Sequence, residues 1–108
     1  MNDDTNSKID ELAVYERNMN SLLAQKQNIN SNILEIKSAL KELETSPTSY
    51  KIIGNIMVQA NKEDLKKDLD GRQEELQLKL KNLEKRESDL LTKTQKLQEE
   101  VMELLKQK

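Results

Sequence analysis

The sequence YKIIGNIMVQ at residues 50–59 is the one apolar run of the chain with the character of β-strands. Gly54 and Asn55 interrupt this run at its centre. A glycine at the first of two turn positions permits the positive φ of a type II′ turn, so the run predicts a two-stranded antiparallel ribbon. The expected cross-strand pairs are Ile53 with Ile56, Ile52 with Met57, Lys51 with Val58, and Tyr50 with Gln59.

Both faces of the predicted ribbon are apolar, because successive side chains along a strand point to opposite faces. A two-stranded ribbon alone is marginally stable in water, and unpaired strand edges invite partners. A chain of 108 residues offers little else to cover it. We therefore expect other subunits to cover the ribbon; packing on the chain's own helix ends is the alternative. The expected assembly residues are Tyr50, Ile52, Ile53, Gly54, Ile56, Met57 and Val58.

The residues before the ribbon predict one long helix at about 7–44. Ser7 followed by Asp10 resembles a capping pair at its start, and Pro47 cannot continue a helix. Apolar residues recur between these points at steps of three and four, which is the period of a coiled-coil seam. The seam comprises Leu12, Tyr15, Met19, Leu22, Ile29, Ile33, Ile36, Leu40 and Leu43, with Lys26 in the one gap.

A second long helix is expected at about 61–107. Asn61 is suited to the N-cap, and Glu63 and Asp64 complement the positive end of the helix dipole. Gly71 lies inside this helix, where glycine costs about 1 kcal/mol relative to alanine. Leucine then recurs every seven residues, at Leu69, Leu76, Leu83, Leu90, Leu97 and Leu104.

The loop and hairpin, at about 45–60, reverse the chain, so the two helices are expected to form an antiparallel coiled coil. The two seams align when facing residue numbers sum to about 109, which places Leu40 opposite Leu69 and Leu12 opposite Leu97. Lys26 and Glu87 then lie one layer apart in the seam. We expect their charged ends to lean toward each other while their stems cover apolar surface.

The second helix carries further apolar residues after Leu97, whereas the facing start of the first helix is polar. Apolar side chains without partners are expected to contact apolar surfaces of other molecules, and flexible methionine suits unselective contact. Scattered apolar groups on frayed helix ends are the alternative.

The composition excludes several classes of protein. With 34% hydrophobic and 35% charged residues, the chain is unsuited to a wide buried core. Its 18 basic and 20 acidic residues nearly balance, which gives no electrostatic reason to bind nucleic acid or an anionic membrane. Without cysteine or histidine it forms no disulfide, no thiolate or imidazole zinc site and no histidine-based catalytic site. We expect no enzyme activity and no cofactor.

The start of the sequence, MNDDTNSK, is polar and acidic, unlike a signal peptide. The sequence also lacks the long apolar run of a membrane span. We therefore expect a soluble, cytoplasmic protein.

The leucine repeat has a second interpretation, a parallel zipper dimer that binds DNA. Such a dimer requires a continuous basic helix before the zipper. Residues 62–68, KEDLKKD, are mixed in sign. Packing within the molecule is therefore the favoured interpretation.

The ribbon and the residues after it resemble the β class of the prefoldin family. The matching residues are YKIIGNIMV at 50–58 and the helix start NKEDL at 61–65. The resemblance covers nearly the whole chain, because β-class members have two long helices flanking one hairpin. Three positions depart from the family pattern: Gln59 replaces the usual lysine, Met57 a common leucine, and Ser49 an apolar residue that often precedes the tyrosine.

This resemblance implies a hexamer of two α-type and four β-type subunits, in which the hairpins build β-barrels and coiled coils project from them. It also implies that the coiled-coil tips hold unfolded polypeptides without ATP and pass them to a group II chaperonin. The single hairpin, balanced charge and few aromatic residues favour an archaeal-type β subunit over a eukaryotic one.

Together these observations predict a single prefoldin-like domain over residues 1–108, mostly α-helical, with one central hairpin. Its expected function is that of an ATP-independent molecular chaperone subunit. A coiled-coil scaffold or tether that links fixed partner proteins is the alternative. The expected client-binding residues are Ile9, Leu12, Val101, Met102, Leu104 and Leu105.

Overall fold

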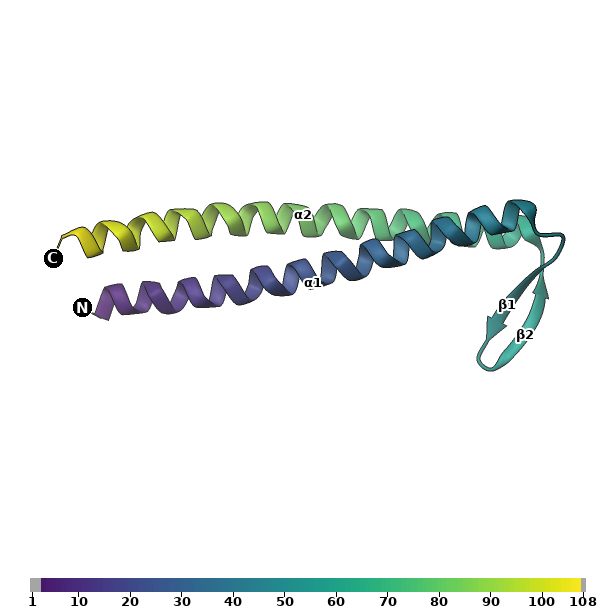
Figure 1. The fold of residues 1–108 in the computed structure, drawn as a ribbon, viewed down its shortest axis with the longest axis horizontal. Coiled ribbons are helices and arrows are strands. Elements are labelled where there is room, and N and C mark those ends of the chain that lie inside the picture. Colours follow the sequence, from purple (N-terminus) through teal and green to yellow (C-terminus); the bar gives the residue numbers. More distant parts are fainter. Residues whose placement is uncertain (1–2, 108) are drawn as a thin grey trace. The chain divides into compact units, whose positions relative to one another are not determined.

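The computed structural model describes residues 3–107 and contains two long helices with an antiparallel hairpin between them (Figure 1). The elements are α1 (Asp3–Thr45), β1 (Ser49–Ile53), β2 (Ile56–Ala60) and α2 (Lys62–Lys106). This is the fold class that the sequence predicts. The described residues form two compact units: a hairpin unit of residues 28–80, and a terminal unit of residues 3–27 and 81–107.

Helix α1 begins at Asp3, so the prediction of a start near Ser7 is wrong. Asp3 and Asp4 occupy its first turn, where carboxylates interact favourably with the positive end of the helix dipole. Thr5 is buried, which shows that this additional turn packs against the molecule. The first turn is therefore held by local charge and by packing.

Helix α1 ends at Thr45, two residues before Pro47. The Thr45 hydroxyl donates a hydrogen bond to the carbonyl oxygen of Glu42 over 3.3 Å. The amide of Ser46 donates to the same carbonyl over 3.0 Å. These bonds satisfy a carbonyl of the last turn, which would otherwise lack an intrahelical partner.

Asn61 caps the start of α2, as the sequence predicts. Its side-chain oxygen accepts hydrogen bonds from the amides of Glu63, over 2.8 Å, and Asp64, over 3.3 Å. Its backbone carbonyl accepts the first helical bond, from the amide of Leu65 over 3.0 Å. This cap starts the second helix directly after the ribbon.

The ribbon has the predicted register, with Ile53 opposite Ile56 and Tyr50 opposite Gln59. Gly54 has a φ of 61°, and no other described residue has a positive φ. A positive φ at the first turn position alone is the pattern of a type II′ turn. At the other end of the ribbon, the buried Ser49 hydroxyl donates a hydrogen bond to the carbonyl of Ala60 over 2.7 Å.

Among residues 3–107, four of the five buried apolar side chains come from the predicted seams, and the fifth, Val101, was expected to be exposed. In the hairpin unit Ile33 is buried. In the terminal unit the buried apolar residues are Leu22, Leu83, Leu97 and Val101. A single row of buried side chains is the core expected of a two-helix coiled coil.

Candidate functional site

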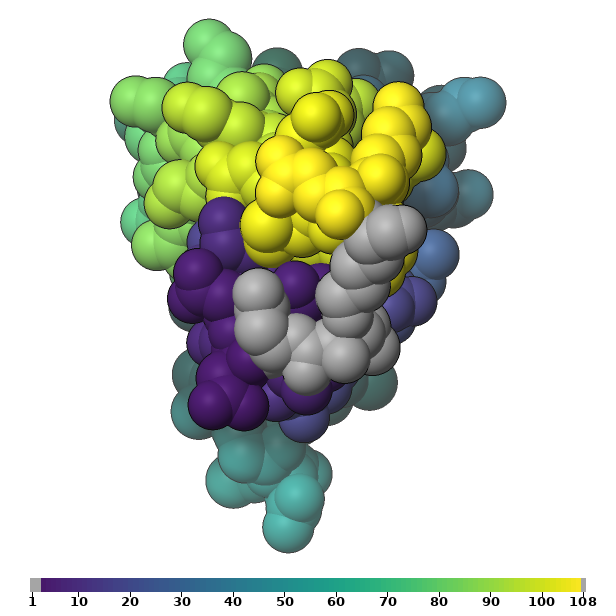
Figure 2. All heavy atoms as spheres, turned by 90° about the vertical axis from the view of Figure 1, so that its left-hand side faces the viewer, coloured from purple at the N-terminus to yellow at the C-terminus, as the bar shows by residue number. Residues whose placement is uncertain are grey.

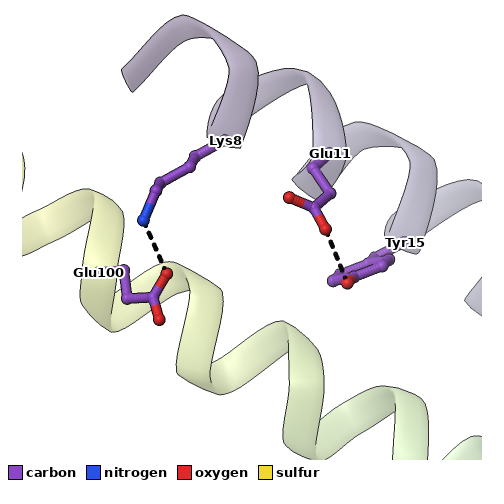
Figure 3. Close-up of polar contacts among 4 residues, drawn as sticks. All are labelled: Lys8, Glu11, Tyr15 and Glu100. Carbon is purple, nitrogen blue, oxygen red and sulfur yellow. Dashed lines mark hydrogen bonds and ion pairs between the residues drawn. The ribbon is translucent and has the colours of Figure 1, made fainter. Parts of the chain in front are cut away.

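The ends of α1 and α2 lie side by side in the terminal unit (Figures 1 and 2). An ion pair joins them: Lys8 Nζ lies 2.9 Å from Glu100 Oε2 (Figure 3). This hydrogen bond raises the pKa of Lys8 above its ordinary 10.5 and lowers the pKa of Glu100 below its ordinary 4.5. Both groups are therefore charged at neutral pH, and they connect the first turns of α1 to the last turns of α2.

A second polar contact lies beside this pair on α1. The Tyr15 hydroxyl donates a hydrogen bond to Glu11 Oε1 over 2.9 Å, one helical turn away (Figure 3). This bond raises the pKa of Tyr15 above its ordinary 10.0, because a carboxylate acceptor favours the protonated phenol. Tyr15 thus occupies its predicted seam position with its hydroxyl bonded at the edge.

The predicted client-binding residues divide into three groups by exposure. Ile9, Met102 and Leu105 are exposed. Leu12 and Leu104 are half-buried. These five residues, which we call the tip patch, gather near the ends of the two helices, all within the terminal unit.

Val101 is buried, with 7% of its surface exposed, so the prediction that it lacks a partner is wrong. The reason lies in the earlier start of α1. The helix already begins at Asp3, and Thr5 in its first turn is itself buried. Val101 therefore contributes to the core beneath the tip patch.

Three exposed apolar residues of the terminal unit were not predicted from the sequence: Val14, Leu23 and Leu91. Leu23 and Leu91 lie on the same flank as Ile9 and Leu105. Leu23 and Leu91 each directly follow a seam leucine, and Leu105 follows the seam leucine Leu104. Ile9 follows Lys8, which continues the heptad pattern of the seam toward the start of α1. Residues that follow equivalent seam positions share one flank of an antiparallel coiled coil. This apolar flank could have been found by reading the positions beside the seam as well as the seam itself.

The opposite flank of the terminal unit is polar. A groove there is lined, besides two seam leucines, by Asn18, Ser21, Arg86, Asp89 and Lys93. Val14 is exposed, and its helical position places it on this polar flank. The terminal unit therefore has one flank with clustered apolar residues and one with clustered charge.

The hairpin unit presents the other predicted surface. The six apolar side chains of the ribbon are 43–69% exposed, and they cover both of its faces. Gly54 lies at the turn between them. The ribbon leaves the ends of α1 and α2 rather than folding back on them (Figure 1). Within the described residues nothing covers either face, as expected of a surface that another chain covers. The six residues are Tyr50, Ile52, Ile53, Ile56, Met57 and Val58.

Among residues 3–107 no three histidine, cysteine, aspartate or glutamate side chains gather as a metal ion requires. None of the described helices is both long enough and apolar enough to cross a bilayer.

Comparison with known proteins identifies the family. Residues 6–108 match the family model described as "Prefoldin subunit". The chain belongs to the prefoldin subunit family. The match confirms, over nearly the whole chain, the resemblance seen in the ribbon sequence. Members of this family are chaperone subunits. Membership also implies hetero-oligomeric assembly with other prefoldin subunits.

Similar proteins carry the name of the β subunit. The prefoldin subunit beta of Sulfurisphaera tokodaii is 41% identical over 90 residues, covering 81% of this chain and 72% of the relative. That of Sulfolobus acidocaldarius is 31% identical over 97 residues, covering 87% and 78%. The crystal structure of the prefoldin beta subunit from Thermococcus strain KS-1 matches with a TM-score of 0.89 at 26% identity, covering 96% of this chain and 94% of that one. The two-helix, one-hairpin fold is therefore shared with a β subunit.

Proposed function

We propose that this chain is a cytoplasmic, ATP-independent chaperone subunit. Its tip patch binds unfolded proteins, and the complex delivers them to a group II chaperonin. It works in a hexamer of two α-type and four β-type subunits, whose ribbons join into β-barrels. The exposure of apolar side chains on both faces of the ribbon carries this proposal, since it accounts for assembly, and assembly is what brings several tips together.

The exposed ribbon is unfavourable in water, and assembly would bury it. A two-stranded ribbon is marginally stable in water, and burying a large apolar side chain contributes about 1.5–3 kcal/mol. Six such side chains are exposed here. Both strands also have a free edge, because the sheet has two strands only. Ribbons of several copies, paired along these edges, would satisfy the edges and bury the side chains.

The tip patch supports client binding. Ile9, Met102 and Leu105 are exposed on helices that hold each other through the core and the Lys8–Glu100 pair. Small apolar contacts of this kind bind weakly and without sequence preference, and methionine adapts to different partners. Several tips on one body raise the affinity through effective concentration. Release requires only a tighter acceptor, so no catalytic step is needed.

The test replaces the exposed tip residues in the assembled complex. Ile9→Ser, Met102→Ser and Leu105→Ser together should abolish suppression of client aggregation, while the mass of the complex stays unchanged. Val101 and residues 106–107 are kept, so the core under the patch is preserved. The matched control is Val14→Ser, which removes an exposed apolar side chain from the polar flank of the same unit and should leave protection intact.

Two unrelated denatured clients should be used in this assay. Protection of both, lost in the triple variant only, is the expected result. Equal protection by the triple variant would show that the tip patch is not the client site. Binding to one folded protein, with no protection of either client, would instead support a scaffold or tether.

A further inference from the structure

Lys26 and Glu87, which lie one layer apart, break the apolar seam of the terminal unit with opposite charges. Lys26 Nζ lies 3.1 Å from Glu87 Oε2, which confirms that the two side chains lean together. The side chains are only 23% and 28% exposed, and Leu22 and Leu83 beside them are buried. Glu87 Oε2 is itself buried and makes no aligned hydrogen bond, so the nearby Lys26 ammonium group compensates its charge.

The other seam residues do not determine which helix pairs with which, or in what register. The leucines of α2 recur every seven residues from Leu69 to Leu104, so every heptad presents the same side chain. Two α2 helices from different copies could place leucine against leucine in parallel along their whole length. Sliding α1 along α2 by one heptad likewise leaves leucine facing the α1 seam. The leucine repeat alone therefore permits several pairings.

Lys26 and Glu87 distinguish among these pairings. In a parallel, in-register pair of α2 helices Glu87 faces Glu87, and in a parallel pair of α1 helices Lys26 faces Lys26. A shift by one heptad places Lys26 beside Leu80 or Thr94, and Glu87 beside Met19 or Ile33. Each alternative buries like charges together or a charge against an uncharged side chain, which is unfavourable.

We propose that Lys26 and Glu87 form a specificity pair, which selects antiparallel pairing of α1 with α2 over parallel zippers between copies and over shifted registers. A polar pair in a coiled-coil seam lowers stability and raises specificity. The proposal rests on the seam and does not depend on the proposed function. If α1 of one copy pairs antiparallel with α2 of another copy, the Lys26–Glu87 contact is retained. The pair therefore disfavours only α1–α1 pairing, α2–α2 pairing and shifted registers.

The test uses the full chain with spin labels, because the absence of cysteine permits labelling at chosen sites. Asn20→Cys and Ser88→Cys are exposed positions on α1 and α2. A doubly labelled chain, diluted into unlabelled chain, reports the distance between the helices of one chain. A chain labelled at Ser88→Cys alone reports whether α2 helices of different copies lie in contact.

Three versions are compared: the original pair, Lys26→Leu with Glu87→Leu, and the charge exchange Lys26→Glu with Glu87→Lys. The original and the exchanged pair should each give one narrow distance within the chain and no close contact between Ser88 labels. The leucine variant should give a broadened distance within the chain and a new population of closely spaced Ser88 labels. It should do so without a lower thermal midpoint, because apolar packing replaces the ion pair.

A milder variant, Lys26→Gln with Glu87→Gln, keeps the proposal testable should the leucine variant aggregate. It removes both charges and should also admit close α2–α2 contacts. The proposal is overturned if both uncharged variants retain a single narrow distance and show no contact between Ser88 labels. Broadening in the charge-exchanged variant to the same extent as in the leucine variant would contradict it as well.

Discussion

Gly54 closes the ribbon with a φ of 61°, and a β-carbon built at this position meets no atom within 4 Å. Space is therefore not the constraint there. The constraint is the backbone, because the left-handed region costs a residue with a β-carbon roughly 1–2 kcal/mol.

Gly54→Val should therefore destabilise the ribbon by about 1–2 kcal/mol, because valine disfavours a positive φ. Hydrogen exchange at the amides of β1 and β2 should become faster, whereas exchange in the terminal unit should be unchanged. Unchanged protection of the ribbon would contradict the type II′ turn.

The Lys8–Glu100 pair gives a pH prediction with two limits. The pKa of Glu100 is lowered, so its contribution is complete above the ordinary 4.5 and is lost as pH falls through the lowered value. The pKa of Lys8 is raised, so its contribution is complete below 10.5 and is lost as pH rises through the raised value. The contact should therefore persist across the neutral range.

An NMR titration of the Glu100 carboxyl carbon checks this prediction. Its midpoint should lie at lower pH in the original chain than in a Lys8→Met variant, which lacks the ammonium partner. Identical midpoints in the two proteins would show that the contact does not form in solution. The effect on global stability should be small, since both side chains are partly exposed to solvent.

Single residues differ in how well their roles could be predicted from the sequence. The Asn61 cap and the Lys26–Glu87 contact could be predicted, because capping chemistry and heptad position are local properties of the sequence. The burial of Thr5 and Val101 could not be predicted, because it depends on whether the polar first turn of α1 packs in the terminal unit. The exposure of Leu23 and Leu91 follows from a simpler property, since both lie beside the seam rather than in it.

Helix α2 contains a glycine in its interior, Gly71, with nothing near the position of an added β-carbon. Glycine is unfavourable inside a helix because it loses more backbone entropy on folding than alanine does. Nothing in the packing of the hairpin unit requires a glycine at this place.

Gly71→Ala should accordingly stabilise the chain by about 1 kcal/mol, measured by thermal unfolding followed with circular dichroism. The matched control is Gly54→Ala, the same chemical change at the positive φ, which should destabilise. A loss of stability in Gly71→Ala would show that the glycine has a structural role.

The ribbon is the element whose sequence and structure agree most closely. All four predicted cross-strand pairs are present, because two short apolar strands around Gly-Asn leave one favourable register. The start of α1 was less predictable, since polar residues near a chain end have weak periodicity and their helical state depends on packing.

Ile53→Asp or Ile56→Asp should prevent assembly, because a carboxylate would be buried between ribbons. Helix content should remain near that of the original chain, since α1 and α2 do not depend on these side chains. Lys51→Gln, a polar-to-polar change on the same face as Ile53, is the control and should assemble normally. Normal complexes from the aspartate variants would contradict the assembly role of the ribbon.

On the scale of the whole molecule, two exposed apolar surfaces lie in separate compact units. The hairpin unit presents the ribbon, and the terminal unit presents the tip patch. The two differ in character: the ribbon is apolar on both faces, whereas the terminal unit is apolar on one flank and charged on the other. This difference suits permanent assembly through the first and weak, reversible binding through the second.

The most direct measurement is the mass of the complex that this chain forms with an α-class prefoldin subunit from the same cell, determined by native mass spectrometry. We expect a complex of two α-type subunits and four copies of this chain. A stable monomer that ignores the α-class subunit, with its ribbon exposed to water, would contradict the account.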